Sequence, residues 1–247
     1  MVNSWLIGID DTDNKESRGT GYLSRMLGHL IEDEKTGLVH SISRHQLFFD
    51  NRIPYTSQNS SACLLVESGD YPHLSQLCRD FMSHNCAPGS DGGLAIASLN
   101  QIPKEIISWG KAAKNTVLTQ ADAWILAKKH NLYLEGFTGN KDGVIGALAA
   151  VGLRKSGNDG RCIWLRGKEI REIQGIYTAK NLKEICAVNR IMTTDAIEAF
   201  EDERINTGDW LRPAIKNNQI IVYIERSNTN EYEWNVKPKS SLKELTD

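Results

Sequence analysis

The stretch LIGIDDTDNKESRGTGY, residues 6–22, is the part of the chain from which the rest is interpreted. A short apolar run over residues 5–9 ends in three carboxylates: Asp10, Asp11 and Asp13. Acidic side chains at the end of a strand suit a hard cation such as Mg²⁺, which takes oxygen ligands and keeps several waters. A glycine-bearing segment, residues 18–21, precedes a helical pattern, and free N–H groups at a helix N-terminus suit phosphate. The stretch predicts a metal–nucleotide site, with an acidic turn that caps the next helix as the alternative.

Length and composition limit the classes of protein to which the chain could belong. The chain has 247 residues, 40% hydrophobic and 24% charged, which predicts a globular protein of one large domain or two small ones. A net charge of −2 argues against strong nonspecific nucleic-acid binding by the whole molecule but leaves a local basic patch open. Five cysteines without a CxxC pair predict reduced structural thiols. We find no signal peptide or membrane-length apolar run and expect a cytoplasmic protein.

The spacing of apolar residues predicts an α+β fold. Strands are expected over residues 4–10, 38–43, 62–67, 94–97, 132–135 and 162–165. Helices are expected over residues 21–33, 71–84, 103–114, 120–129, 144–151 and 178–188, with Thr119 as an N-cap. Residues 219–225 and 232–236 predict a β-hairpin near the C-terminus, after a polar turn region at 201–213.

A second glycine-rich stretch, GFTGNKDGVIGALAAVG at residues 136–152, opens an alanine-rich helix. Gly139, Gly143 and Gly146 are candidates for contacts to a nucleotide through the backbone, and Lys141 lies beside them. The spacing matches neither the P-loop nor the dinucleotide fingerprint. Close packing of small residues against a sheet is the alternative explanation of these glycines.

The polar loop over residues 50–61 is a candidate substrate loop because it offers many hydrogen-bonding side chains at low steric cost. Its candidate substrate-binding residues, with one just before it, are His45, Tyr55, Ser57 and Asn59. A plain surface connection is the alternative for the loop. His45 would then be an ordinary surface or core histidine.

Three motifs in order resemble a known enzyme family. They are IGIDDTD at residues 7–13, IPYTSQNSSA at 53–62 and GVIGALAAVGLR at 143–154. The chain resembles, over roughly residues 5–155, the archaeal agmatinylcytidine synthetases, which modify the minor isoleucine tRNA. The first and third motifs are specific as a pair, whereas either alone would be weak.

The resemblance implies an ATP-using kinase domain accompanied by ferredoxin-like, OB-fold and zinc-ribbon parts. Enzymes of this family use ATP and Mg²⁺ to phosphorylate the C2 oxygen of an anticodon cytidine, and agmatine then displaces the phosphate. By position, Asp10, Asp11 and Asp13 match the family's DDTD aspartates. Thr20 matches the family's autophosphorylated threonine, and the GVIGALAAVG segment matches the glycine loop and helix that line the nucleotide.

Several positions depart from the family. Arg18-Gly19-Thr20-Gly21 replaces a Met-Cys-Thr-Thr stretch, and Asn59-Ser60 replaces a Gly-Asn. Thr56 and Gln58 replace a lysine and an arginine of the substrate loop, so two charges suited to an RNA backbone are missing. The chain also ends too early for an OB-fold and a zinc ribbon. The resemblance therefore supports ATP chemistry better than a tRNA substrate.

We expect a kinase-like domain over residues 1–61 and 116–190, with a ferredoxin-like domain inserted at 62–115. Residues 191–247 form a C-terminal extension that contains the β-hairpin. Insertion is favoured because both candidate phosphate loops flank the 62–115 segment and should meet in space.

The predicted function is an ATP- and Mg²⁺-dependent phosphoryl-transfer enzyme, a kinase or ligase, that acts on a different or smaller acceptor. Asp10, Asp11 and Asp13 would hold Mg²⁺, and one of them would orient or deprotonate the acceptor. Arg18 or Lys141 would neutralise the γ-phosphate, while Thr20 would accept the phosphoryl group or contact the nucleotide beside Gly19. A stand-alone tRNA cytidine-modifying enzyme and a non-catalytic nucleotide-binding regulatory module are the alternatives. A homodimer is left open.

Overall fold

The computed structural model describes residues 2–56, 58–238 and 240–242, and these divide into two compact units. Unit 1 is Met1–Ser156, and unit 2 is Gly157–Asp247. Each unit is described by itself below.

Unit 1 is built on an antiparallel sheet. Its strands are β1 (Asn3–Asp10), β2 (Leu38–Gln46), β3 (Ser60–Ser68), β4 (Gly93–Ser98) and β5 (Tyr133–Gly136). Their spatial order is β2-β3-β1-β4-β5, and every neighbouring pair is antiparallel. Because β1 lies in the middle of this order, the carboxylates at its end are flanked by strands on both sides.

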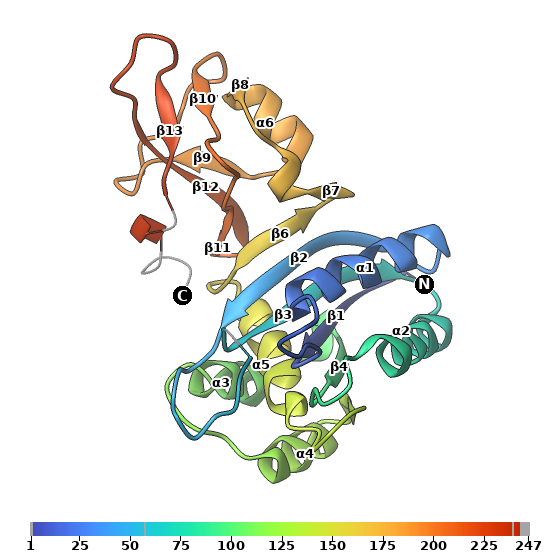
Figure 1. The fold of residues 1–247 in the computed structure, drawn as a ribbon. Helices are drawn as coiled ribbons and strands as arrows, with labels where there is room; N and C mark the ends of the chain where they lie inside the picture. The colour runs from blue at the N-terminus through green and yellow to red at the C-terminus, as the bar shows by residue number, and fades with distance from the viewer. Residues whose placement is uncertain (1, 57, 239, 243–247) are drawn as a thin grey trace. The chain divides into compact units, whose positions relative to one another are not determined.

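Helices cover both faces of this sheet (Figure 1). They are α1 (Thr20–Asp33), α2 (Tyr71–Asn85), α3 (Lys104–Ala112), α4 (Gln120–Lys129) and α5 (Gly143–Ser156), and a 3-10 turn, η1, spans Leu99–Gln101. From β1 to β4 the elements run β-α-β-β-α-β with the strand order β4-β1-β3-β2, which is the ferredoxin-like arrangement. The α+β class predicted from the sequence is confirmed.

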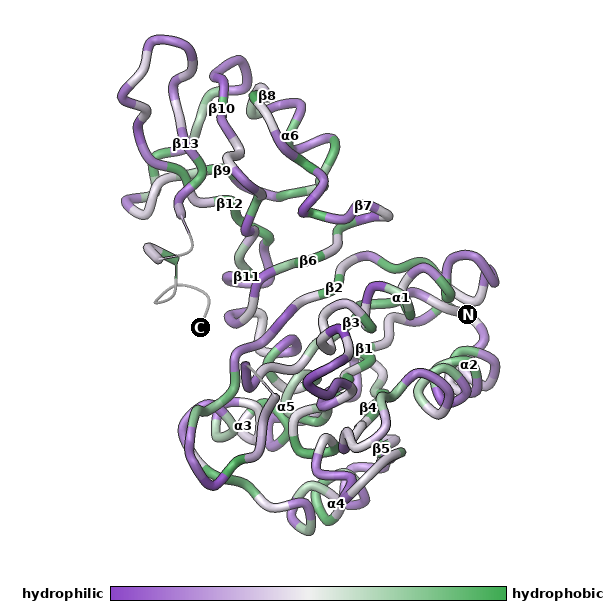
Figure 2. The backbone as a smooth tube through the Cα atoms, in the orientation of Figure 1, coloured by the Kyte–Doolittle hydropathy of each residue, from purple (hydrophilic) through white to green (hydrophobic). Residues whose placement is uncertain are grey.

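Alternation along β1 decides which face each helix covers. The Gly8 position faces α5, because a Cβ built there would lie 2.1 Å from the carbonyl oxygen of Ala147. Its neighbour Ile7 pairs with Leu64, which pairs with Ile42, and Ile42 lies beneath α1 against Gly28. Helix α5 therefore packs flush on the face opposite α1. In Figure 2 the loop that leaves the end of β1 is coloured hydrophilic, in contrast to the buried strand before it.

The observed division differs from the expected insertion of a ferredoxin-like domain at residues 62–115. That segment contains β3 and β4, and both pair directly with β1, so it belongs to the same unit as residues 3–10. The unit boundary lies after Ser156 rather than at residue 190. Periodicity predicts single elements but not which strands pair, and the central place of β1 was for that reason not foreseen.

Unit 2 is a smaller β-rich unit. Its strands are β6 (Arg161–Leu165), β7 (Lys168–Glu169), β8 (Ile176–Thr178), β9 (Arg190–Met192), β10 (Arg204–Asn206), β11 (Ala214–Lys216), β12 (Gln219–Arg226) and β13 (Trp234–Val236), with η2 (Ile170–Glu172) and α6 (Ala179–Cys186). The predicted hairpin is confirmed, since β12 and β13 pair antiparallel. The expected polar turn region at 201–213 contains β10, a strand too short for a periodic signal.

The cysteines agree with the prediction of reduced thiols. All five cysteines are free thiols. Among the described residues, the structure has no helix of the length and apolarity needed to cross a bilayer.

Candidate active site

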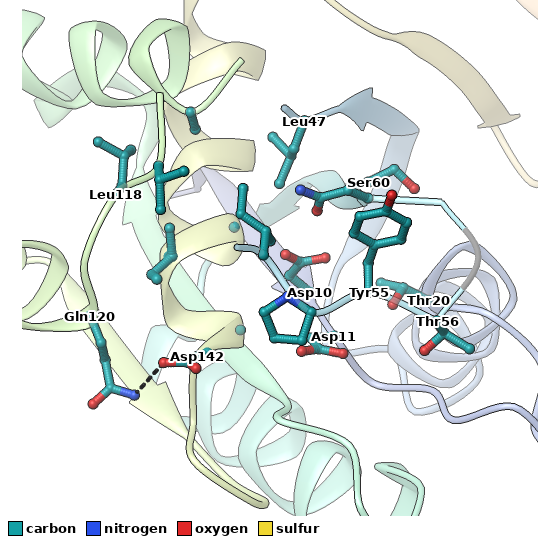
Figure 3. A pocket seen from close by; sticks show the side chains of 18 of the residues that line it. Asp10, Asp11, Thr20, Leu47, Tyr55, Thr56, Ser60, Leu118, Gln120 and Asp142 are labelled. Carbon is teal, nitrogen blue, oxygen red and sulfur yellow. Dashed lines mark hydrogen bonds between the residues drawn. The ribbon is translucent and has the colours of Figure 1, made fainter. Parts of the chain in front are cut away.

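A cavity of about 340 Å³ lies in unit 1. Four segments line it: the end of β1 with the loop to α1, the 47–60 loop, the 113–120 segment, and the start of α5. Asp10 and Asp11 lie between the segment that carries Leu118 and Gln120 and the segment that carries Tyr55 (Figure 3). The two loops that the sequence singled out as phosphate-binding candidates thus meet at one cavity.

Asp10, the last residue of β1, is held against the first turn of α5. A Cβ at Gly146 would lie 1.7 Å from the Asp10 Oδ2 atom, so the carboxylate occupies the space that any other side chain would fill. A Cβ at Gly143 would likewise lie 2.9 Å from the Asp10 carbonyl oxygen. Burial, with the nearby Asp11 charge, raises the pKa of Asp10 well above its usual range. The glycines of α5 act here by close packing, and two of them also line the cavity.

Asp11 adopts a strained backbone conformation at the cavity wall. Its φ of 50° lies in the left-handed region, where aspartate is tolerated better than most residues. Burial is the first cause that raises the pKa of Asp11 to about 6, followed by repulsion from Asp91, Asp13 and Asp142. The carboxylate therefore lies in a local excess of negative charge.

Asp13 links the loop after β1 to the first residue of α1 by hydrogen bonds. Its Oδ1 atom accepts hydrogen bonds from the backbone N–H and from the hydroxyl of Thr20, each at 3.0 Å. The N-cap residue, Gly19, has no side chain to cap the helix, so Asp13 performs this task from outside the helix. Thr20 also accepts a hydrogen bond from the Thr12 hydroxyl at 3.1 Å. The helix-capping alternative raised for this loop is therefore realised by Asp13, and the same contacts orient the Thr20 hydroxyl.

Two further aspartates near β1 were not singled out from the sequence. Asp142 lines the cavity and accepts a hydrogen bond from the Gln120 side chain at 3.1 Å. Asp91 accepts the Gly143 N–H at its carbonyl oxygen at 2.9 Å, and its carboxylate accepts the Asn140 N–H. Each stands in a glycine-bearing loop, in PGSDGG and GNKDG, and that shared context was the available signal.

The rest of the cavity is lined by both apolar and uncharged polar residues. Its apolar lining residues include Leu47, Ile53, Val117, Leu118 and Ile145. Tyr55 and Asn59, both predicted substrate contacts, also line it. Arg52 is the basic residue among the lining side chains described, and its guanidinium donates to both carboxylate oxygens of Asp50 at 2.7 and 2.8 Å. The cavity thus combines an acidic side with an apolar side, as sites for charged small molecules do.

Several predicted site residues lie elsewhere. Lys141 and Arg18 are exposed and do not line the cavity; the Arg18 guanidinium stacks on Tyr22 at 4.5 Å. Gly19 and Gly139 serve as a helix N-cap and a left-handed turn, with φ of 49° at Gly139.

The position of His45 also differs from the expectation that it contacts substrate. Its side chain is fully buried, and its Nε2 atom shares a hydrogen bond of 2.8 Å with the Ser43 hydroxyl. Strand β2 continues to Gln46, three residues beyond the predicted end at 43, which places His45 inside the sheet rather than in the loop. Ser57, the remaining predicted contact, lies outside the described residues.

The carboxylates at the cavity have the chemistry of metal ligands but no preformed metal-site geometry. In the part of the chain that the structure describes, no three His, Cys, Asp or Glu side chains converge as a preformed metal site. The donors at the cavity are nevertheless carboxylates that raise one another's pKa, as shown for Asp11. Oxygen donors with an uncompensated negative charge suit Mg²⁺, which takes one or two protein carboxylates and completes its shell with water and phosphate oxygens. The residues present fit such an ion as the partner of a bound nucleotide.

Comparison with known proteins agrees with the motifs. No protein-family model matches the chain. The isoleucine-tRNA 2-agmatinylcytidine synthetase TiaS of Methanosarcina acetivorans is 28% identical over 154 residues, 60% of this chain. The chain is similar to part of TiaS. It spans 35% of the length of that protein. The resemblance found in the three motifs is therefore confirmed.

Solved structures give the same relationship. A crystal structure described as a tRNA fluorescent labeling enzyme matches with a TM-score of 0.54 and 25% identity over 60% of this chain and 36% of its own. The complex of TiaS with its isoleucine tRNA, AMPCPP and agmatine matches at 24% identity and a TM-score of 0.54, over 61% of this chain and 36% of its own. The likeness to this TiaS structure concerns the fold, over about a third of its length.

Proposed function

We propose that the chain is an ATP- and Mg²⁺-dependent phosphoryl-transfer enzyme of the general kind to which TiaS belongs. One observation carries the proposal: the Asp10 carboxylate packs against the first turn of α5 at a cavity that Asp11, Asp13 and Thr20 also line. The similarity to TiaS, whose solved complexes contain ATP or AMPCPP, supports the use of a nucleotide.

The cavity suits a nucleoside triphosphate by size and by the character of its walls. Its volume of about 340 Å³ falls at the lower end of small-molecule sites. The phosphates would lie near the N-terminus of α5, where the helix dipole favours an anion. The base would lie against the apolar side, between Leu47, Leu118 and Ile145.

Asp10 and Asp11 would hold the metal ion beside the phosphates. When bound, the ion neutralises charge that develops on the phosphoryl oxygens. The raised pKa of each of these carboxylates reflects burial and repulsion that an arriving cation would relieve. Arg52, rather than Arg18 or Lys141, is the lining residue that would add positive charge on the protein side.

Thr20 is proposed as the group that accepts the phosphoryl. Its hydroxyl lies 3.0 Å from Asp13 Oδ1, within the reach expected of a nucleophile and its base. The Thr20 Oγ–phosphorus bond would form as the bond from the γ-phosphorus to the bridging oxygen breaks. ADP would leave, and the hydroxyl proton would pass to Asp13.

The final acceptor is proposed to be smaller than, or different from, that of TiaS. Thr56 and Gln58 supply no charge for an RNA backbone. A tRNA acceptor is the second candidate, favoured by the relative's name and by its tRNA complexes.

The test is incubation of the purified full chain with γ-labelled ATP and Mg²⁺, with and without total tRNA. We expect label on the wild-type protein, none on Thr20→Ala, and retained label on Thr20→Ser, which keeps the hydroxyl. Ser17→Ala is the matched control, because Ser17 is an exposed hydroxyl of the same loop outside the cavity.

The outcomes separate the candidates. Hydrolysis that rises only with tRNA would favour the RNA-modifying enzyme. Label that survives in Thr20→Ala would overturn the role of Thr20 but leave phosphoryl transfer in place. Nucleotide binding without hydrolysis or labelling in any arm would refute the enzyme and favour a regulatory module.

A further inference from the structure

A small recess in unit 2 gathers positive charge around one tryptophan. Three segments form it, and their basic and aromatic lining residues are Arg161, Arg171, Trp210 and Arg212. The Gln174 side chain donates to the carbonyl oxygens of Asp209 at 2.8 Å and Arg171 at 3.3 Å, which ties the second segment to the third. The Cys162 N–H donates to the Pro213 carbonyl at 2.8 Å, which ties the first segment to the third. The recess is therefore held by hydrogen bonds between all three segments.

Two guanidinium groups are stacked on the Trp210 ring. The Cζ atoms of Arg171 and Arg212 lie 4.8 and 4.9 Å from its centroid. Stacking on an aromatic face holds a guanidinium in place while leaving its N–H edge free to donate. Each guanidinium is a permanently charged fork whose N–H groups match the geometry of phosphate oxygens.

The charge of these two arginines is not balanced by a carboxylate. Within the described chain neither Arg171 nor Arg212 forms an ion pair, although Glu172 and Asp209 are close to them in the sequence. Other arginines of unit 2 differ: Arg190 pairs with Glu198, and Arg226 lies 3.7 Å from a Glu203 oxygen. Arg171 and Arg212 thus form no ion pair among the described residues, whereas Arg190 and Arg226 do.

Arg212 also carries an unused donor. Its Nε atom is buried without a hydrogen-bond partner in the described part of the chain, while its Nη1 atom donates to the Trp210 carbonyl at 3.3 Å. Burial lowers the pKa of Arg212, and the nearby Asp209 opposes this only in part. The recess has a volume of about 20 Å³, room for one water-sized atom such as a single phosphate oxygen. An anion seated at its mouth would supply the missing acceptor.

We propose that Arg171, Arg212 and Trp210 form a second binding site, on unit 2, for a phosphate group. One oxygen enters the recess, and the remaining oxygens accept from the two stacked guanidiniums. The phosphate is either free or part of a phosphodiester backbone that lies along the Trp210 surface. The site is independent of the proposed ATP chemistry, because all of its residues belong to unit 2.

The test uses the full chain in EDTA, which removes divalent cations from the unit 1 cavity. The probes are a short fluorescein-labelled oligouridylate, followed by anisotropy, and inorganic phosphate, followed by ³¹P line broadening. Arg171→Gln is the main variant, because this exposed side chain can be changed without disturbing the core. Arg226→Gln is the matched control, because Arg226 also stacks on a tryptophan of unit 2, Trp234, but is paired with Glu203.

We expect Arg171→Gln to weaken oligouridylate binding about five-fold and to reduce the salt slope by about 0.7, the loss of one contact to a single strand. Arg226→Gln should bind within about two-fold of wild type. If inorganic phosphate displaces the oligonucleotide and its line broadening disappears in Arg171→Gln, the site takes free phosphate. If inorganic phosphate does not displace the oligonucleotide in this way, the ligand is the phosphodiester backbone. Equal affinity and equal salt slope in the two variants, or no binding of either probe, would overturn the proposal.

Discussion

Gly146 is the residue on which the position of Asp10 depends. A Cβ built on it would lie 1.7 Å from Asp10 Oδ2, far inside van der Waals contact. Within a helix, glycine costs up to about 1 kcal/mol relative to alanine, so helix propensity alone would favour a substitution. Its presence in α5 is explained by the space that the Asp10 carboxylate requires.

Gly146→Ala is therefore expected to destabilise the protein by about 1–3 kcal/mol, because the clash outweighs the gain in helix propensity. It should also abolish ATP-dependent labelling by displacing Asp10. Urea unfolding followed by circular dichroism measures the first effect. Gly19→Ala is the matched control, since a Cβ there meets nothing closer than 3.9 Å. An unchanged or increased stability of Gly146→Ala would show that Asp10 does not rest on α5.

Helix α1 is capped by a residue six positions before its N-cap. Asp13 accepts from the N–H and the hydroxyl of Thr20, in place of a capping side chain at Gly19. The carboxylate therefore has two separable properties: an acceptor oxygen that stabilises the helix and a charge that serves the site. The two can be distinguished by substitution.

Asp13→Asn is expected to keep most of the stability, because its amide oxygen still accepts from Thr20, but to lose labelling because it cannot take a proton. Asp13→Ala is expected to lose labelling and also about 1 kcal/mol of stability, the usual cost of a lost cap. Thermal unfolding of both variants beside the labelling assay gives the comparison. Equal stability of the two variants would contradict the capping role.

The whole molecule concentrates negative charge where three distant segments of chain meet. Asp10 and Asp11 lie at the end of β1, Asp91 precedes β4, and Asp142 precedes α5. Repulsion and burial raise the pKa of Asp11 from 3.8 to about 6, and the pKa of Asp10 and Asp142 rises as well. The folded protein thus holds protons that the unfolded chain has already released between about pH 4 and pH 6.

The free energy of unfolding should consequently fall as pH rises through this window, since the folded state binds more protons than the unfolded state there. The raised pKa of Asp11 should lower the free energy of unfolding by on the order of 2 kcal/mol at neutral pH. Asp11→Asn should make the free energy of unfolding depend less on pH. The variant should be more stable than wild type near pH 7.5, although inactive. Urea titrations in EDTA at about pH 4 and pH 7.5 measure the difference. If the free energies of unfolding of wild type and Asp11→Asn change with pH in parallel, the prediction for Asp11 is refuted.

The sequence predicted the elements well because each carries its own periodic signal. Helix α4 has the predicted bounds, 120–129, and its N-cap Thr119 accepts from the Asp122 N–H as expected. Short strands such as β9 and β11 were missed, since three residues hold too little pattern. Four residues that the sequence singled out, Asp10, Thr20, Gly143 and Gly146, line one cavity, and their roles there stay predictions.

By itself the sequence determined the α+β class, most helices and strands of unit 1, and the two glycine-bearing loops that meet at the cavity. These are local properties, because periodicity, capping and glycine content each depend on residues that are close together in the sequence. Only the tertiary structure decided that β1 is central, that Asp91 and Asp142 join the acidic cluster at the cavity, and that His45 is buried. Strand pairing in unit 1 joins residues as far apart as Trp5 and Ser98, and the approach of α5 to β1 joins Gly8 to Ala147. No local pattern encodes which of these residues will meet.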